Sequence, residues 1–104
     1  MNQIPEIEPQ DLDIHAKNQI IVDVRRPDEY SGELGHIEGA RLITLGAELD
    51  DFLAEQKPGM KYIFVCHAGG RSARATMQAL SYELDAYNLI GGMSYWVQSG
   101  LPTV

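Results

Sequence analysis

Residues 62–75, YIFVCHAGGRSARA, contain the change of pattern that decides the fold and chemistry of this chain. The apolar, β-prone run from Tyr62 to Val65 ends at Cys66, the only cysteine among 104 residues. Two glycines, an arginine and a serine follow, and a helical pattern begins directly after them. We therefore predict a strand that ends at Cys66, a tight glycine-rich turn and then a helix.

The segments on either side of this stretch alternate between strand and helix patterns. The strand patterns cover residues 5–9, 19–24, 40–45, 61–66 and 87–92. The helix patterns cover residues 9–18, 26–32, 46–59, 72–84 and 93–100. Strands that are apolar on both faces and separated by helices indicate a parallel sheet with helices on both sides. The sequence thus predicts an α/β fold, a single domain over residues 1–104 with about five parallel strands.

The helix after Cys66 shows an apolar stripe. Ala73, Met77, Leu80 and Leu84 fall at i, i+4, i+7 and i+11, which is one face of a helix. We expect this face to be buried against the sheet. Arg74 lies one position from the stripe, and we expect it to be exposed.

Composition and charge exclude several classes of function. The chain is 44% apolar and 22% charged, as in ordinary globular proteins, and it lacks an apolar run of about 18 residues that could span a membrane. Its net charge of −7 argues against binding to nucleic acid or to an anionic membrane. The acidic N-terminal stretch does not resemble a signal peptide, and a single cysteine cannot form an internal disulfide. We therefore expect a cytoplasmic protein.

The turn after Cys66 has the residues needed to hold an anion. Residues 68–70 have little or no side chain, so successive backbone N–H groups can point inward and form an anion-binding nest. The helix that begins near Ser72 adds its free N–H groups and positive dipole end, and Arg71 adds a charged fork of donors. A lone cysteine at a strand end is usually a small core residue. In this context we instead predict an activated Cys66 thiolate beside an anionic group.

Four segments carry a family resemblance. CHAGGRSARA resembles the active-site loop of rhodanese-type sulfurtransferases, C-x-x-G-x-R-S. IIVDVRRPDEY, GHIEGARLI and LIGGMSYWVQSGLP resemble three further segments of that family, in the same order, over roughly residues 10–102. Glu38 replaces the proline usual in the family, and SGEL at residues 31–34 is longer than in many members. Both departures lie outside the loop.

The resemblance implies a covalent mechanism. The Cys66 thiolate attacks the outer sulfur of a small anionic donor such as thiosulfate, sulfite leaves, and a nucleophilic acceptor takes the sulfur from the Cys66 persulfide. That acceptor is cyanide in an assay, and a thiol or a protein in the cell. Arg71 binds the donor. The substrate cradle is formed by the backbone of His67, Ala68, Gly69, Gly70 and Ser72. We expect no cofactor or metal, and a monomer or weak homodimer.

Three alternatives remain open at this point. The chain could be a persulfide carrier that hands sulfur to one protein partner, using the same residues. It could be a cysteine phosphatase or arsenate reductase, but the loop of those enzymes is C-x5-R, and here only four residues separate Cys66 from Arg71. An inactive interaction domain would normally lack the cysteine.

Other polar residues have simpler interpretations. We expect the carboxylate of Asp23, in an apolar strand, to accept hydrogen bonds from neighbouring loop amides. Arg25 and Glu29 lie four residues apart and are candidates for an ion pair. His36 is expected to hydrogen-bond a turn rather than to act as a base. For His67, contact with substrate and exposure to solvent are equally compatible with the sequence.

Overall fold

The computed structural model describes residues 3–104 and contains a parallel sheet of five strands in the order β1-β5-β4-β2-β3. The strands are β1 (Glu6–Ile7), β2 (Gln19–Asp23), β3 (Arg41–Leu42), β4 (Lys61–Val65) and β5 (Asp85–Leu89). The helices are the short 3-10 helix η1 (Pro9–Asp11), α1 (Pro27–Tyr30), α2 (Ala47–Glu55), α3 (Gly70–Ser81) and α4 (Gly92–Gln98). Among the described residues, no helix is long and apolar enough to cross a membrane.

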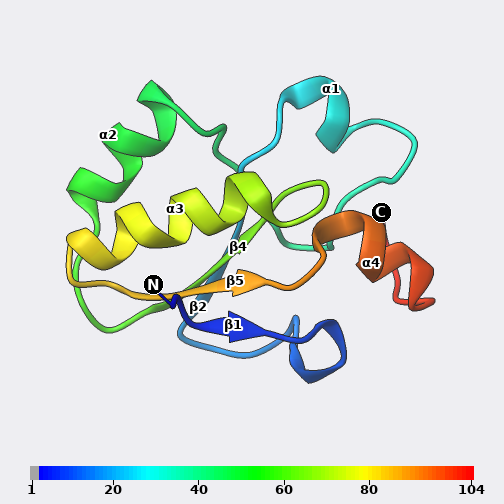
Figure 1. The fold of residues 1–104 in the computed structure, drawn as a ribbon, viewed down its shortest axis with the longest axis horizontal. Helices are drawn as coiled ribbons and strands as arrows, with labels where there is room; N and C mark the ends of the chain where they lie inside the picture. The colour runs from blue at the N-terminus through cyan, green and yellow to red at the C-terminus, as the bar shows by residue number, and fades with distance from the viewer. Residues whose placement is uncertain (1–2) are drawn as a thin grey trace.

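Successive residues of a strand point to opposite sides of the sheet, and side chains on both sides are buried. On one side, Val22 and Phe64 belong to a core that α2 and α3 complete. On the other side, Ile21 and Ile63 pack in a second core with residues of α4, including Trp96. Figure 1 shows α2 and α3 together on one side of the sheet. The predicted α/β fold, with helices on both faces, is confirmed.

Helix α3 buries a different face from the one its apolar stripe predicts. The side chains against the sheet are small: Ser72, Ala75, Thr76 and Ala79. Met77 and Leu80 are 48% and 36% exposed. The apolar stripe was misleading because Leu84 lies beyond the end of the helix, and because small residues let a helix approach a sheet closely. This rotation turns Ser72 toward the sheet and exposes Arg74 as expected.

The predicted helix over residues 9–18 is wrong beyond its first turn. Only Pro9–Asp11 form a 3-10 helix. The side chain of Asp13 accepts a hydrogen bond from the backbone N–H of His15 at 2.9 Å, a local turn that competes with helix formation. Asn18 then has a φ of 62°, which is incompatible with a continuing helix. Leu12 is nevertheless buried in the core beside α4.

The strands end together at one edge of the sheet. Asp23 of β2 pairs in register with Val65 of β4, so the residues that follow both strands lie at the same edge. The arrows of β1 and β5 in Figure 1 point toward this edge, where α4 also begins. In open α/β sheets the carboxyl edge is where ligands bind. The fold thus brings Cys66 to the expected position.

Candidate active site

The loop between β4 and α3 folds around the sulfur of Cys66. Gly69 precedes α3 with a φ of 110°, a backbone conformation that residues other than glycine rarely adopt. This turn directs the N–H of Gly69 to Sγ of Cys66 at 3.0 Å. Cys66 itself is only 1% exposed. The glycine-rich turn therefore forms a backbone donor for the sulfur, as the sequence predicted.

Ser72 provides a second donor to the sulfur. Its hydroxyl lies 3.2 Å from Sγ of Cys66, at the first turn of α3. Burial raises the pKa of the Cys66 thiol. Hydrogen bonds from the Ser72 side chain and from the amides of Ser72, Gly69 and Ala68 act against burial and leave the pKa below its ordinary value. The loop thus favours the thiolate, the nucleophilic form of cysteine.

Asn88 is a site residue that the sequence interpretation missed. Its side chain is 5% exposed and contacts both residues that donate hydrogen bonds to the sulfur. The single proton of the Ser72 hydroxyl is shared between Sγ of Cys66 and Oδ1 of Asn88, which lies 2.5 Å from the hydroxyl oxygen. Nδ2 of Asn88 donates to the carbonyl of Gly69 at 3.3 Å. An asparagine between Tyr87 and Leu89, near the end of β5, was the available signal. Asn88 thereby connects the loop around Cys66 to the neighbouring strand.

The start of α4 supports the loop from the other side. The N–H of Met93 donates to the carbonyl of Cys66 at 2.8 Å, and that of Ser94 to the carbonyl of His67 at 2.9 Å. Gly92 has a φ of 59°, and a Cβ there would collide with the carbonyl oxygen of Cys66 and lie 2.7 Å from that of His67. The glycine pair at the start of α4, Gly91 and Gly92, therefore allows two segments of backbone to meet at the site.

Arg71 forms a two-pronged ion pair with Glu29. Its Nη1 and Nη2 donate to Oε1 and Oε2 of Glu29 at 2.8 and 2.9 Å. The pKa of Glu29 falls to about 2, mainly because Arg71 donates hydrogen bonds to its carboxylate, while partial burial acts in the opposite direction. The predicted pairing of Glu29 with Arg25 is wrong, because Arg25 turns inward to another partner.

That partner is Asp23, at the end of β2. Nε and Nη2 of Arg25 donate to the two carboxylate oxygens of Asp23 at 2.9 and 2.8 Å, and both residues are at most 1% exposed. The expected loop amide is also present, since the N–H of Arg25 donates to Asp23 at 3.1 Å. Arg25 additionally donates to the carbonyl of Gly35 at 2.8 Å. The buried pair thus ties the end of β2 to the segment after α1.

The two histidines near the site differ in their surroundings. Nδ1 of His36 donates to the carbonyl of Tyr30 at 2.9 Å, and the two rings stack with centroids 3.6 Å apart. The expectation that His36 hydrogen-bonds a turn is confirmed. His67 is exposed and lines a cavity of about 250 Å³ beside the loop. The other residues that line it are Arg25, Asp28, Glu29, Gly32, Glu33 and Leu34.

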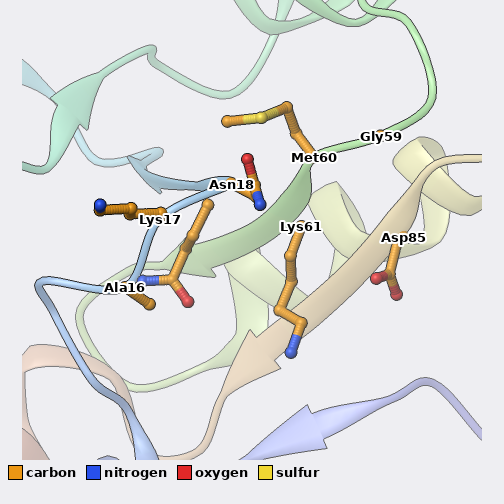
Figure 2. A pocket seen from close by; sticks show the side chains of 8 residues that line it. Ala16, Lys17, Asn18, Gly59, Met60, Lys61 and Asp85 are labelled. Atoms are coloured by element: carbon orange, nitrogen blue, oxygen red, sulfur yellow. The ribbon is translucent and has the colours of Figure 1, made fainter.

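A second hollow, of about 370 Å³, lies at the opposite edge of the sheet, where β2, β4 and β5 begin. Figure 2 shows its side chains. The charged ends of Lys17, Lys61 and Asp85 lie apart from one another there. The polar groups of this hollow do not converge on one point, in contrast to those around Cys66.

Within residues 3–104, no three His, Cys, Asp or Glu side chains gather as metal ligands would.

Known proteins are similar to this chain in both sequence and fold. Thiosulfate sulfurtransferase 16, chloroplastic, from Arabidopsis thaliana is 34% identical over 79% of this chain and 77% of that protein. An uncharacterized protein of Synechocystis is 37% identical over 82% of this chain, which spans 46% of that longer relative. The crystal structure of a rhodanese-related protein from Thermoplasma volcanium matches with a TM-score of 0.83 and 29% identity, over 96% of this chain and 97% of that one.

The family model that describes the rhodanese-like domain matches residues 9–99, which include both core clusters and the whole loop around Cys66. The chain therefore belongs to the rhodanese-like domain family.

Proposed function

We propose that this protein is a sulfurtransferase that carries a sulfane sulfur on Cys66. One observation carries the proposal: the Cys66 sulfur accepts hydrogen bonds from Gly69 and Ser72 in a loop at the carboxyl edge of the sheet. A relative that is named a thiosulfate sulfurtransferase supports the same reaction class. Hydrogen-bond donors aimed at one sulfur suit an anion that forms there, whether thiolate or persulfide.

The proposed reaction has two half-reactions. The Cys66 thiolate attacks the outer sulfur of thiosulfate, a new S–S bond forms, and the old S–S bond breaks with its electron pair leaving on sulfite. An acceptor nucleophile then attacks the outer sulfur of the persulfide and restores the thiolate. Arg71 is proposed to engage the oxyanion of the donor. The amides of the cradle would stabilise the persulfide: His67, Ala68, Gly69, Gly70 and Ser72.

The cellular acceptor is proposed to be a thiol or a protein, with the reaction taking place in the cytoplasm in a monomer or weak homodimer.

The phosphatase alternative is not favoured. Only four residues separate Cys66 from Arg71, whereas five separate the two residues in the phosphatase loop. A phosphate ester needs the wider loop.

Thiocyanate formation from thiosulfate and cyanide tests the proposal. The wild-type protein should turn over, and Cys66→Ala should lose activity by about 10³-fold or more, the scale seen when a nucleophile is removed. Circular dichroism controls for folding. Activity that survives in Cys66→Ala would contradict the mechanism. Sulfur uptake on Cys66 without turnover would instead identify a carrier whose acceptor is a protein.

A further inference from the structure

The ion pair with Glu29 engages part of the Arg71 guanidinium that an anionic donor would need. Both terminal nitrogens of Arg71 point to the carboxylate, at 2.8 and 2.9 Å. The two side chains are only 33% and 19% exposed, so water competes weakly for this contact. A thiosulfate ion that reaches the loop therefore meets a guanidinium whose charge is already balanced by a carboxylate and two of whose five N–H donors are engaged.

Glu29 is held in this position by its own helix. Its Oε1 also accepts a hydrogen bond from the backbone N–H of Arg26 at 3.1 Å, which caps α1. The carboxylate is charged at neutral pH, since its pKa is about 2. Displacing Glu29 from Arg71 would leave a partly buried carboxylate without its main partner. Such a displacement has a free-energy cost that weakens donor binding.

The surroundings offer little compensation to an anion. Asp28 and Glu33 line the same cavity as Glu29, beside His67. The arginine that lines this cavity, Arg25, is neutralised by Asp23. The chain as a whole has a net charge of −7. Asp28 is itself paired with Arg26, and Glu33 adds a further negative charge to the rim. A dianion such as thiosulfate is therefore repelled more strongly at this rim than a neutral or cationic donor.

We propose that Glu29 sets donor selectivity: by holding Arg71 it disfavours donors with an oxyanion and favours a persulfide, R–S–SH, with an uncharged or cationic R group. This inference rests on the proposed sulfurtransferase function. In the transfer, the Cys66 thiolate attacks the outer sulfur of R–S–SH and an S–S bond forms to Sγ. The bond to the inner sulfur breaks, and its electron pair leaves on R–S⁻, so the step needs no further oxidant or reductant.

Glu29→Gln tests whether Glu29 competes with anionic donors for Arg71. Glutamine removes the charge but can still accept the hydrogen bond from the N–H of Arg26 that caps α1. The first readout is chemical: the rates at which iodoacetate, an anion, and iodoacetamide, its neutral analogue, alkylate Cys66. The iodoacetate-to-iodoacetamide ratio should rise about tenfold in Glu29→Gln, because Arg71 becomes available to the anion. An unchanged ratio would overturn the proposal.

Glu33→Gln is the matched control. It removes the same charge from the same cavity, and within residues 3–104 the Glu33 carboxylate makes no ion pair with an arginine. Its alkylation ratio should change by less than about twofold, as expected for an exposed and screened charge. An equal rise in both variants would mean that the overall negative potential matters rather than Glu29, and would overturn the proposal.

Donor kinetics provide the second readout. Glu29→Gln should raise kcat/KM for thiosulfate about tenfold and leave kcat/KM for cysteamine persulfide, a cationic donor, unchanged or lower. A fall for thiosulfate would show that Glu29 positions Arg71 for the donor, and would overturn the proposal. If neither donor adds sulfur to Cys66 in either protein, the sulfurtransferase function itself fails. The alkylation ratio would still decide whether Glu29 competes with anions for Arg71.

Discussion

The two edges of the sheet differ in how their polar groups are held. At the carboxyl edge, Gly69 and Ser72 donate to one sulfur, and Asn88 contacts both of them. At the amino edge, Lys17 and Lys61 extend apart around an open hollow (Figure 2). The hollow at the amino edge, about 370 Å³, is larger than the cavity of about 250 Å³ beside the loop. Convergence of donors, rather than the size of a hollow, identifies the reactive edge.

The largest effect should come from breaking the buried pair at the carboxyl edge. Asp23→Asn leaves Arg25 buried without its counter-charge, and should lower the free energy of unfolding by about 3–5 kcal/mol. Asp28→Asn is the control, since its pair with Arg26 is mostly exposed and screened by solvent, and its loss should change the free energy of unfolding far less. Urea unfolding measures both. Equal losses would mean that burial does not distinguish the two pairs.

Gly92→Ala should disturb the site by steric collision. The new Cβ would press on the carbonyls of Cys66 and His67, move the loop and lower kcat/KM for sulfur transfer by about 100-fold. Gly59→Ala, at the amino edge, is the matched control. It also has positive φ, at 119°, but its Cβ would meet nothing within 4 Å. It should cost about 1 kcal/mol of stability and leave activity intact. Loss of activity in both variants would contradict this contrast between the edges.

Ser72→Ala should raise the pKa of Cys66, because it removes a hydrogen bond that stabilises the thiolate. The thiolate would then form only at higher pH, so the midpoint of iodoacetamide alkylation should move to higher pH. The alkylation rate at neutral pH should fall accordingly, by about tenfold. A midpoint that stays in place would show that the loop amides alone stabilise the sulfur.

The smallest effect is expected at the amino edge. Lys61→Met removes a cation that lies 5.1 Å from the ring centre of Tyr87, and should cost about 0.5–1 kcal/mol of stability. Sulfur transfer should be unchanged, because Lys61 lies at the opposite end of β4 from Cys66. Thermal unfolding and steady-state kinetics measure the two quantities. A loss of activity would give this hollow a role that the account does not assign to it.

The sequence allows local features to be predicted well, but it indicates contacts between distant residues poorly. The turn at Gly69 and the strand that ends at Cys66 follow from neighbouring residues, and both were predicted. The pairing of Glu29 with Arg71 joins residues 42 positions apart, and only the folded sheet brings them together. Asn88 likewise meets Ser72 because β5 lies beside β4. No spacing rule indicates either contact.

The buried face of α3 shows a second limit. Met77 and Leu80 are apolar and correctly spaced, yet the helix turns its smaller residues inward. The close approach of the helix to the sheet selects Ala75 and Ala79 there, because larger side chains would not fit. Periodicity alone weighs residues by hydrophobicity and ignores the width of the space that they must fill.

The most direct test of the central claim is the intact mass of the protein before and after exposure to excess thiosulfate. We expect a gain of about 32 Da, one sulfur atom, that is removed by cyanide and is absent in Cys66→Ala. A wild-type protein that gains no mass from thiosulfate or from a persulfide donor would contradict the claim that Cys66 carries sulfur. A gain that persists in Cys66→Ala would contradict it equally.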